Sequence, residues 1–128
     1  MEIDKNMEIL VVDDFATMRK VIKNLLKQAG YKNITEAEDG VAALTVLKSQ
    51  KINFIISDWN MPNMNGLELL KAVRADNELS GLPFLMVTAE GLKENIVQAV
   101  KAGVSNYIIK PFTAEVLSEK IEKTVKSL

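Results

Sequence analysis

Hydrophobic residues are grouped along this chain in two ways, as short continuous runs and as longer segments in which they recur every three or four positions. Continuous short runs are typical of strands that are buried on both faces of a parallel sheet. Four runs are clear, and a fifth is weaker and is typical of an edge strand. In chain order the predicted strands are residues 9–12, 33–37 (the weaker one), 54–56, 84–87 and 107–109.

The segments between these runs predict amphipathic helices. The clearest has an apolar stripe from Met18 to Ala29, with basic residues on the opposite face and Gly30 as its stop signal. Further helices are expected to open at Asp39-Gly40 and at Gly66, to run from about 93 to 102 before Gly103, and to begin after Pro111. Thr113 is the expected N-cap of the fifth helix. The expected inner-face residues are Val21, Ile22, Leu25 and Leu26 in the first helix, Val41, Leu44 and Leu47 in the second, Leu67, Leu70 and Val73 in the third, and Leu117, Ile121 and Val125 in the fifth.

Strands and helices thus alternate in five successive units, which predicts an α/β fold. Parallel strands need helical crossovers, and these are right-handed almost without exception, so helices should flank both faces of one sheet. The length of 128 residues fits a single domain. We expect residues 1–6 to form a flexible N-terminus and residues 7–128 to form one domain, with no output domain.

Composition narrows the chemistry. The chain has no cysteine and no histidine, which excludes disulfides, thiolate nucleophiles, imidazole metal ligands and a Ser-His-Asp triad. A net charge of −1 argues against a nucleic-acid partner, although residues 91–128 carry 6 lysines against 4 glutamates. No apolar run approaches the roughly 18 residues of a membrane helix. The protein is therefore expected to be cytoplasmic, without membrane insertion.

Polar residues follow four of the predicted strands. Asp13 and Asp14 follow the first, Asp58 the third, Thr88 the fourth and Lys110 the fifth. Ligands of open α/β sheets bind outside the carboxyl ends of the strands, so these side chains should converge. Three carboxylates favour a hard cation, with Mg²⁺ as the leading candidate. Together with a lysine and a hydroxyl they indicate a phosphoryl-transfer site, in which Asp58 could form an acyl phosphate.

Each of these residues has a simpler interpretation when it is taken alone. Asp13 or Asp14 would more often cap a helix than bind a metal. Thr88 is an ordinary strand-end residue, Lys110 a solvated lysine and Asp58 a turn former. Only their joint occurrence at the strand ends favours a site. Two aromatic residues, Tyr107 and Trp59, also have a simpler interpretation, because each taken alone would more often be a packing residue.

The motifs at these positions resemble the receiver domain of two-component response regulators over essentially the whole chain. The resemblance is carried by Val12-Asp13-Asp14, Asp58, Thr88-Ala89 and Lys110-Pro111-Phe112. It extends to the chemotaxis regulators of that family through longer strings, at 11–15, 17–19, 57–64, 66–70 and 86–90. A flavodoxin-like sheet with strand order 2-1-3-4-5 is implied.

The resemblance also implies a role for each site residue. Asp58 would be the phosphoacceptor, and Mg²⁺ would be held by Asp13, Asp14, Asp58 and the backbone carbonyl of Asn60. Lys110, in a cis Lys110-Pro111 bond, would pair with the phosphoryl group. Two further roles are implied: a switch formed by Thr88 and Tyr107, and tuning of hydrolysis by Asn60 and Glu90.

Partners follow from the same resemblance. A chemotaxis histidine kinase would donate the phosphoryl group. The phosphorylated form would bind the flagellar motor switch protein through residues from about 93 to 128. A phosphatase is a further candidate partner, and the protein would be a monomer. The protein would be a signalling switch that catalyses only its own phosphotransfer and autodephosphorylation. Two departures from the family pattern stand out: Asn65 replaces an aspartate at an expected exposed turn, and Gly91 follows Glu90.

Other functions remain open at this stage. A receiver that signals to a non-motor partner would have the same site. An FMN carrier would need Ser, Thr and Gly after the first strand, where Asp13, Asp14 and Phe15 stand. A phosphatase of the haloacid-dehalogenase type would carry its nucleophile after the first strand, and a degenerate receiver would lack part of the acid, Thr and Lys set.

Overall fold

The computed structural model describes residues 3–89 and 93–127. Within these ranges five strands and five helices alternate, as the sequence predicts. The strands are β1 (Glu8–Val12), β2 (Asn33–Ala37), β3 (Phe54–Asp58), β4 (Phe84–Thr88) and β5 (Asn106–Ile109), and the helices are α1 (Ala16–Gln28), α2 (Gly40–Ser49), α3 (Gly66–Ala75), α4 (Lys93–Lys101) and α5 (Ala114–Lys126).

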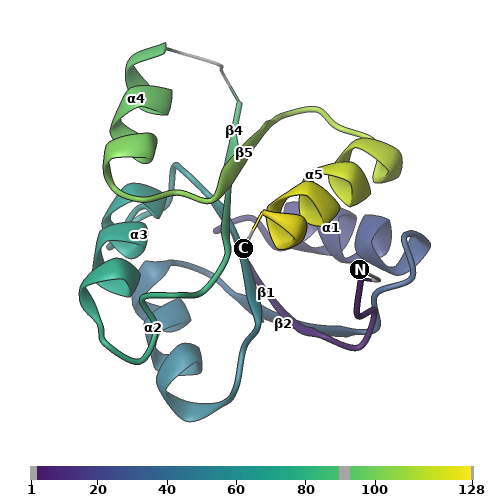
Figure 1. Cartoon of the computed structure of the whole chain (residues 1–128), viewed down its shortest axis with the longest axis horizontal. Helices are drawn as coiled ribbons and strands as arrows, with labels where there is room; N and C mark the ends of the chain where they lie inside the picture. Colours follow the sequence, from purple (N-terminus) through teal and green to yellow (C-terminus); the bar gives the residue numbers. More distant parts are fainter. Residues whose placement is uncertain (1–2, 90–92, 128) are drawn as a thin grey trace.

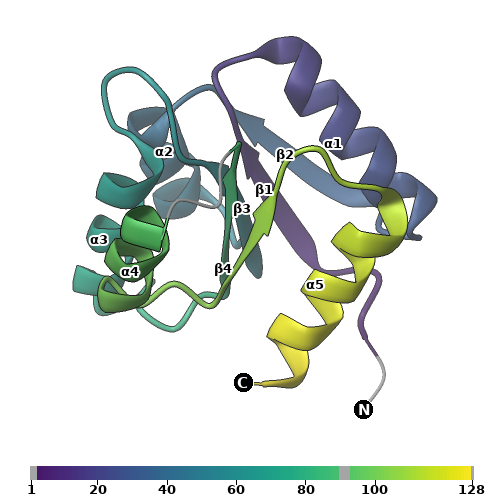
Figure 2. The same cartoon turned by 90° about the horizontal axis from the view of Figure 1, so that it is seen from above.

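All neighbouring strands are parallel, and their order in the sheet is β2-β1-β3-β4-β5. This is the flavodoxin-like order that the family resemblance implies. Helices α1 and α5 cover one face, and α2, α3 and α4 cover the other (Figures 1 and 2). The order reverses between β1 and β3, where the first and third βα connections diverge to opposite faces and leave a crevice for a ligand.

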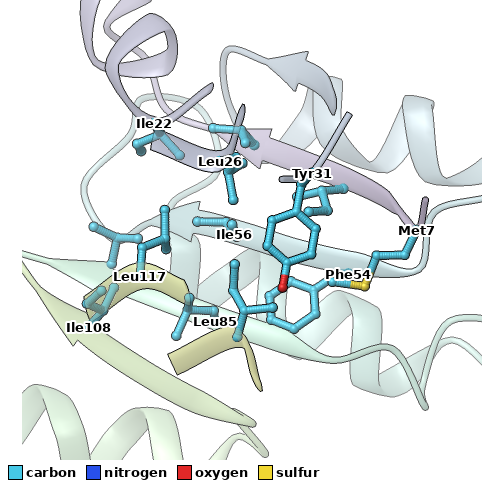
Figure 3. Packing of buried hydrophobic residues seen from close by; sticks show 13 residues of the cluster. Met7, Ile22, Leu26, Tyr31, Phe54, Ile56, Leu85, Ile108 and Leu117 are labelled. Carbon is cyan, nitrogen blue, oxygen red and sulfur yellow. The ribbon is translucent and has the colours of Figure 1, made fainter. Parts of the chain in front are cut away.

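The core consists of two clusters, one on each face of the sheet. Successive side chains of a strand point to opposite faces, so a continuous apolar run supplies both clusters. In β1, Ile9 and Val11 join the cluster under α1 and α5, shown in Figure 3, whereas Leu10 and Val12 join the cluster under α2 and α3. The continuous runs in the sequence therefore follow from burial on both faces.

Three positions expected to be buried are exposed. Val21 in α1 and Val41 in α2 are 45% and 52% exposed. Val41 lies two positions before the buried Ala43, which is about 200° around the helix. Ile109 is 44% exposed because β5 is an edge strand with β4 as its neighbour in the sheet, so the apolar run 107–109 is not buried on both faces.

Most helix ends agree with the sequence signals. Asp39 and Thr113 cap α2 and α5 by accepting hydrogen bonds from Ala42 N at 2.8 Å and Val116 N at 3.2 Å. Asn65 is not a plain exposed turn: it caps α3 in a reciprocal capping box with Glu68. None of the described helices is long and apolar enough to cross a bilayer.

Candidate functional site

The polar residues that follow the strands meet at one edge of the sheet. Asp13 and Asp14 follow β1, Asp58 is the last residue of β3, Thr88 is the last residue of β4, and Lys110 follows β5. The register aligns these ends, with Asp58 opposite Val87 and Thr88 opposite Ile109. Residues separated by almost a hundred positions in the sequence therefore lie on one rim.

Three carboxylates form a compact group on this rim. Oxygen atoms of Asp13, Asp14 and Asp58 all lie within 4.8 Å of one another. The Lys110 Nζ atom lies 3.1 Å from Asp58 Oδ1 and 3.7 Å from Asp13 Oδ2. Asp13 and Asp58 are buried, whereas Asp14 is nearer to solvent. One ammonium thus lies within ion-pair distance of two members of a group of three carboxylates.

This balance of charge is visible in the pKa of Asp58. Burial raises the pKa of its carboxyl above the usual value, and the nearby Asp13 charge adds to the rise, although the hydrogen bond and the charge of Lys110 oppose it. Lys110 therefore does not fully offset the cost of an ionised Asp58. A further cation at the group would lower that cost.

The donor atoms fit a hard divalent cation. Asp13 Oδ2 is buried and has no hydrogen-bond partner among the described residues, although Lys110 is within ion-pair distance. Such an oxygen, beside two other carboxylates, is available for coordination. Oxygen-only ligands select Mg²⁺ or Ca²⁺ over softer metals, and Mg²⁺ typically takes one or two carboxylates and retains waters. Asp13, Asp14 and Asp58 are the side chains that could hold such an ion.

The capping interpretation of Asp13 and Asp14 is wrong. The N-cap of α1 is Phe15, and no side chain caps this helix. Asp13 instead accepts a hydrogen bond from Phe15 N at 2.9 Å through Oδ1, and its backbone carbonyl accepts one from Arg19 Nη1 at 2.7 Å. Asp13 is therefore fixed by the turn after β1, and its second oxygen remains available at the rim.

The connection from β3 to α3 forms the other wall. Trp59 N donates to Val87 O at 3.0 Å, and Gly66 N donates to Trp59 O at 2.8 Å. A Cβ atom on Gly66 would collide with the backbone carbonyl of Asp58, so the glycine permits this close return of the chain. A shallow hollow lies beside the acids, lined by Asp14, Asn60, Met61, Pro62 and Asn65.

The remaining predicted site residues are placed as follows. Lys110 N donates to the carbonyl of the buried Thr88 at 2.8 Å, and the Lys110-Pro111 bond is cis, as the resemblance implies. Tyr107 on β5 is half-buried, and Lys120 Nζ lies 5.1 Å from the centroid of its ring. Glu90 and Gly91 lie outside the described residues.

Sequence reasoning missed the long-range side-chain contacts of three residues in the elements and loops around the site. Arg19 contacts the backbone of Asp13 and also pairs with Glu36 on β2, at 3.1 Å. Asp39 and Asn63 are joined by a hydrogen bond of 2.8 Å across 24 residues. Asp39 stands where the sequence predicts that a helix opens, but no local signal pairs it with Asn63, because the contact depends on how two loops meet in the fold.

The fold and the site together define a class: a flavodoxin-like α/β domain with a group of three carboxylates and a lysine at the carboxyl ends of its strands. Comparison with protein families places the chain in one family of that class. The model of the response regulator receiver domain matches residues 9–122, and the chain belongs to this family.

Relatives narrow the type of receiver. The chain is 53% identical to chemotaxis protein CheY-3 of Vibrio cholerae, covering 98% of this chain and 97% of the relative. It is 57% identical to chemotaxis protein CheY of Pseudomonas aeruginosa, over 91% and 94% of the two chains. This chain is thus a receiver domain of the CheY type.

Solved structures agree with this assignment. The structure of chemotaxis protein CheY4 of Vibrio cholerae matches with a TM-score of 0.87 and 34% identity, over 93% of this chain and 98% of that one. A putative response regulator from Chloroflexus aurantiacus matches with a TM-score of 0.89 and 29% identity, over 94% and 98%. The protein is a signalling component of the chemotaxis response-regulator type.

Proposed function

We propose that Asp58 accepts a phosphoryl group from the phosphohistidine of a chemotaxis kinase in a Mg²⁺-dependent reaction, and that the phosphorylated protein binds the flagellar motor switch. The observation that carries this proposal is the ion pair between Lys110 Nζ and Asp58 Oδ1, at 3.1 Å, within a group of three carboxylates. The identity to CheY-type relatives supports the same function.

The chemistry needs an imidazole from another protein, because this chain contains no histidine. A carboxylate oxygen of Asp58 forms a bond to phosphorus while the phosphorus–nitrogen bond of the donor breaks and the imidazole leaves. Lys110 pairs with the transferred group. Asp13, Asp14, Asp58 and the Asn60 carbonyl would hold Mg²⁺, whose charge stabilises the phosphoryl oxygens. Positioning and neutralisation of charge supply most of the catalysis.

Output requires that the phosphoryl group favours one conformation over another. Thr88 would hydrogen-bond a phosphoryl oxygen, and Tyr107 would turn inward, which would alter the surface of α4, β5 and α5. Exposed apolar side chains lie on these elements and would suit a protein partner: Val97, Val100, Ile109 and Val116. Asn60 and Glu90 would tune hydrolysis of the acyl phosphate.

Replacing Asp58 with Asn tests the phosphoacceptor. Covalent labelling by a phosphorylated chemotaxis kinase should be lost, because an amide is not a nucleophile for phosphorus. Asp76→Asn is a suitable control, since Asp76 is a carboxylate at the end of α3, away from the acidic group, that bonds Glu78 N. Undiminished labelling of the Asp58→Asn variant would show that the acceptor is a different residue.

Output is tested separately with a beryllium fluoride complex, which mimics the phosphorylated form. Addition of Mg²⁺ and the mimic should change the fluorescence of Trp59, which adjoins the acceptor and is the one tryptophan in the chain. The loaded protein should then retain motor switch components in a pull-down. Retention of a different signalling protein, and not the switch, would favour a non-motor output.

A further inference from the structure

Asp39 is a buried carboxylate that joins two loops. It lies between β2 and α2 and is only 6% exposed. One oxygen accepts the hydrogen bond from Ala42 N that caps α2, at 2.8 Å. The other oxygen accepts a hydrogen bond from Asn63 Nδ2, also at 2.8 Å. Both oxygens are therefore used, one within α2 and one for the loop between β3 and α3.

The loop between β3 and α3 is packed tightly against the start of α2. Gly40 N donates to Met64 O at 3.1 Å. A Cβ atom added to Gly40 would lie 2.9 Å from that carbonyl oxygen and closer still to the Met64 side chain. Asn63 has a φ of 65°, in the left-handed region. The Asp39–Asn63 hydrogen bond thus stabilises a left-handed backbone conformation at Asn63, in a loop that is tightly packed against the start of α2.

The same loop borders the acidic group. It begins directly after Asp58 and Trp59, and Asn60 lines the hollow beside Asp14. Its far end is fixed, because Asn65 caps α3. Between these ends, the loop is bonded through Asn63 to the side chain of Asp39, which is the N-cap of α2. A shift at Asn63 would therefore reach Asn60, three residues away, through a backbone that is bonded at both ends.

We propose that Asp39 and Asn63 are positioning residues for the metal site: their hydrogen bond sets the backbone of residues 60–63 so that the Asn60 carbonyl reaches an ion held by Asp13, Asp14 and Asp58. The inference rests on the proposed function, because it requires that Asn60 is a ligand. Asp39 acts through the loop and touches neither the ion nor the phosphoryl group.

The expected effect is moderate. Side chains that orient a ligand through hydrogen bonds typically contribute about 10- to 100-fold to metal affinity when they bond the ligand itself. Here the hydrogen bond lies three residues from the ligand, so we expect its loss to weaken Mg²⁺ binding by roughly threefold to tenfold, which is below that range.

Four variants separate this role from a general loss of stability. Asn63→Gly removes the amide but keeps the left-handed backbone accessible. Asp39→Ser retains a cap for α2 but cannot reach Asn63. Asp39→Asn has the same charge as the serine variant and restores the contact when the Asn63 amide turns to present its oxygen. Asn33→Ala is the matched control, because Asn33 Nδ2 makes a hydrogen bond of 2.8 Å to Asn6 O at the opposite edge of the sheet.

Mg²⁺ affinity is measured by titration of Trp59 fluorescence in the unphosphorylated proteins, with unfolding followed by circular dichroism in parallel. Asn63→Gly and Asp39→Ser should each weaken Mg²⁺ binding, whereas Asp39→Asn should bind more tightly than Asp39→Ser. Asn33→Ala should bind as the wild type does. The Asn63→Gly/Asp39→Ser double variant should bind no more weakly than the weaker single variant, because one bond is lost in each.

The results distinguish this inference from the proposed function. If the wild type binds Mg²⁺ and both single variants bind equally well, the positioning role is wrong and the metal site stands. Additive losses in the double variant, or equal affinities of Asp39→Ser and Asp39→Asn, would also overturn it. If Mg²⁺ causes no change in the wild type, the metal site and the positioning role both fail.

Discussion

Buried polar atoms differ in what surrounds them, and this difference separates function from packing at the scale of single residues. Asp13 Oδ2 and the Tyr31 hydroxyl are both buried without a hydrogen bond to a described residue. Asp13 lies among carboxylates beside Lys110, where an ion would satisfy its oxygen. Tyr31 lies in the apolar cluster under α1 and α5, close to Phe54 and Met7 in Figure 3. We infer a ligand role for the first atom and a cost to stability for the second.

Tyr31→Phe should therefore stabilise the protein. Burial, with a contribution from Glu122, raises the pKa of the Tyr31 phenol to about 12, so the group is neutral. Its hydroxyl loses water without gaining a hydrogen-bond partner among the described residues. Removal of an unsatisfied buried group should raise the free energy of unfolding by about 1 kcal/mol, measured by urea denaturation. The Lys5 ammonium, 4.3 Å from the ring centroid, remains in place.

Tyr31→Leu is the comparison for this prediction. It also removes the hydroxyl, but it loses the ring and its contact with Lys5, and we expect it to be less stable than Tyr31→Phe by about 1–3 kcal/mol. A Tyr31→Phe variant that unfolds more easily than the wild type would mean that the hydroxyl has a stabilising partner, such as an ordered water.

At the scale of the elements, single side chains join helices that are separate in the sequence. Arg74 on α3 donates to the carbonyls of Gly103, Ser80 and Leu82 and to Ser105 Oγ, at distances from 2.7 to 3.2 Å. Its guanidinium makes no salt bridge to a carboxylate in the described ranges. Arg74 thus ties the end of α4 and the start of β5 to α3, near the surface expected to change on phosphorylation.

Arg74→Lys should loosen this region and leave the acidic group intact. A lysine cannot reproduce the planar fork that reaches several carbonyls at once, so we expect a loss of about 1–3 kcal/mol in the free energy of unfolding. Hydrogen exchange should become faster in residues 99–106. Mg²⁺ affinity should match that of the wild type, and a large decrease would show that Arg74 also supports the site.

Asp39 makes the stability of α2 dependent on pH. The hydrogen bonds from Ala42 N and then Asn63 lower the pKa of its carboxyl below the usual value. A carboxyl with a lowered folded-state pKa stabilises the fold at pH values above its unfolded-state pKa of about 3.9. This stabilisation is lost as the pH falls through the folded-state pKa.

Asp39→Asn measures this contribution, because an amide stands in for the protonated carboxyl at all pH values. Urea denaturation should find the wild type more stable than the variant at pH 7. The difference should shrink as the pH falls below about 4. A difference that stays constant between pH 7 and pH 3 would contradict the link to this carboxyl.

At the scale of the whole molecule, the fold concentrates negative charge at one end of the sheet. The net charge is only −1, yet three carboxylates lie within 4.8 Å of one another. Like charges this close are costly, so the folded protein stores a repulsion that a cation or a substitution relieves. This cost is a consequence of the function that we propose for the site.

Asp58→Asn should therefore be more stable than the wild type in a chelator, because it removes one buried charge. Mg²⁺ should raise the Tm of the wild type, since a ligand that binds the folded state stabilises it by mass action. It should raise the Tm of Asp58→Asn less. Calorimetry with and without Mg²⁺ tests both statements, and a wild type more stable than the variant in chelator would contradict them.

The sequence by itself determined the elements and the candidate site. Continuous apolar runs are read directly as strands buried on both faces, and the residue that follows each strand must lie at its carboxyl end, so Asp13, Asp58 and Lys110 could be grouped before any contact was known. The opening of α2 at Asp39-Gly40 and the Thr113 cap of α5 were predictable for the same reason: the interaction at each helix start is made within a few residues.

Only the tertiary structure decided which side chains contact one another across the fold. Whether Asp13 caps α1 or faces the site depends on the turn after β1, and the structure assigns the cap to Phe15. The burial of Ile109 depends on β5 being an edge strand, and the hydrogen bond between Asp39 and Asn63 on how two loops pack. Local periodicity reports one element at a time, whereas these contacts arise from the relative placement of elements that are far apart in the chain.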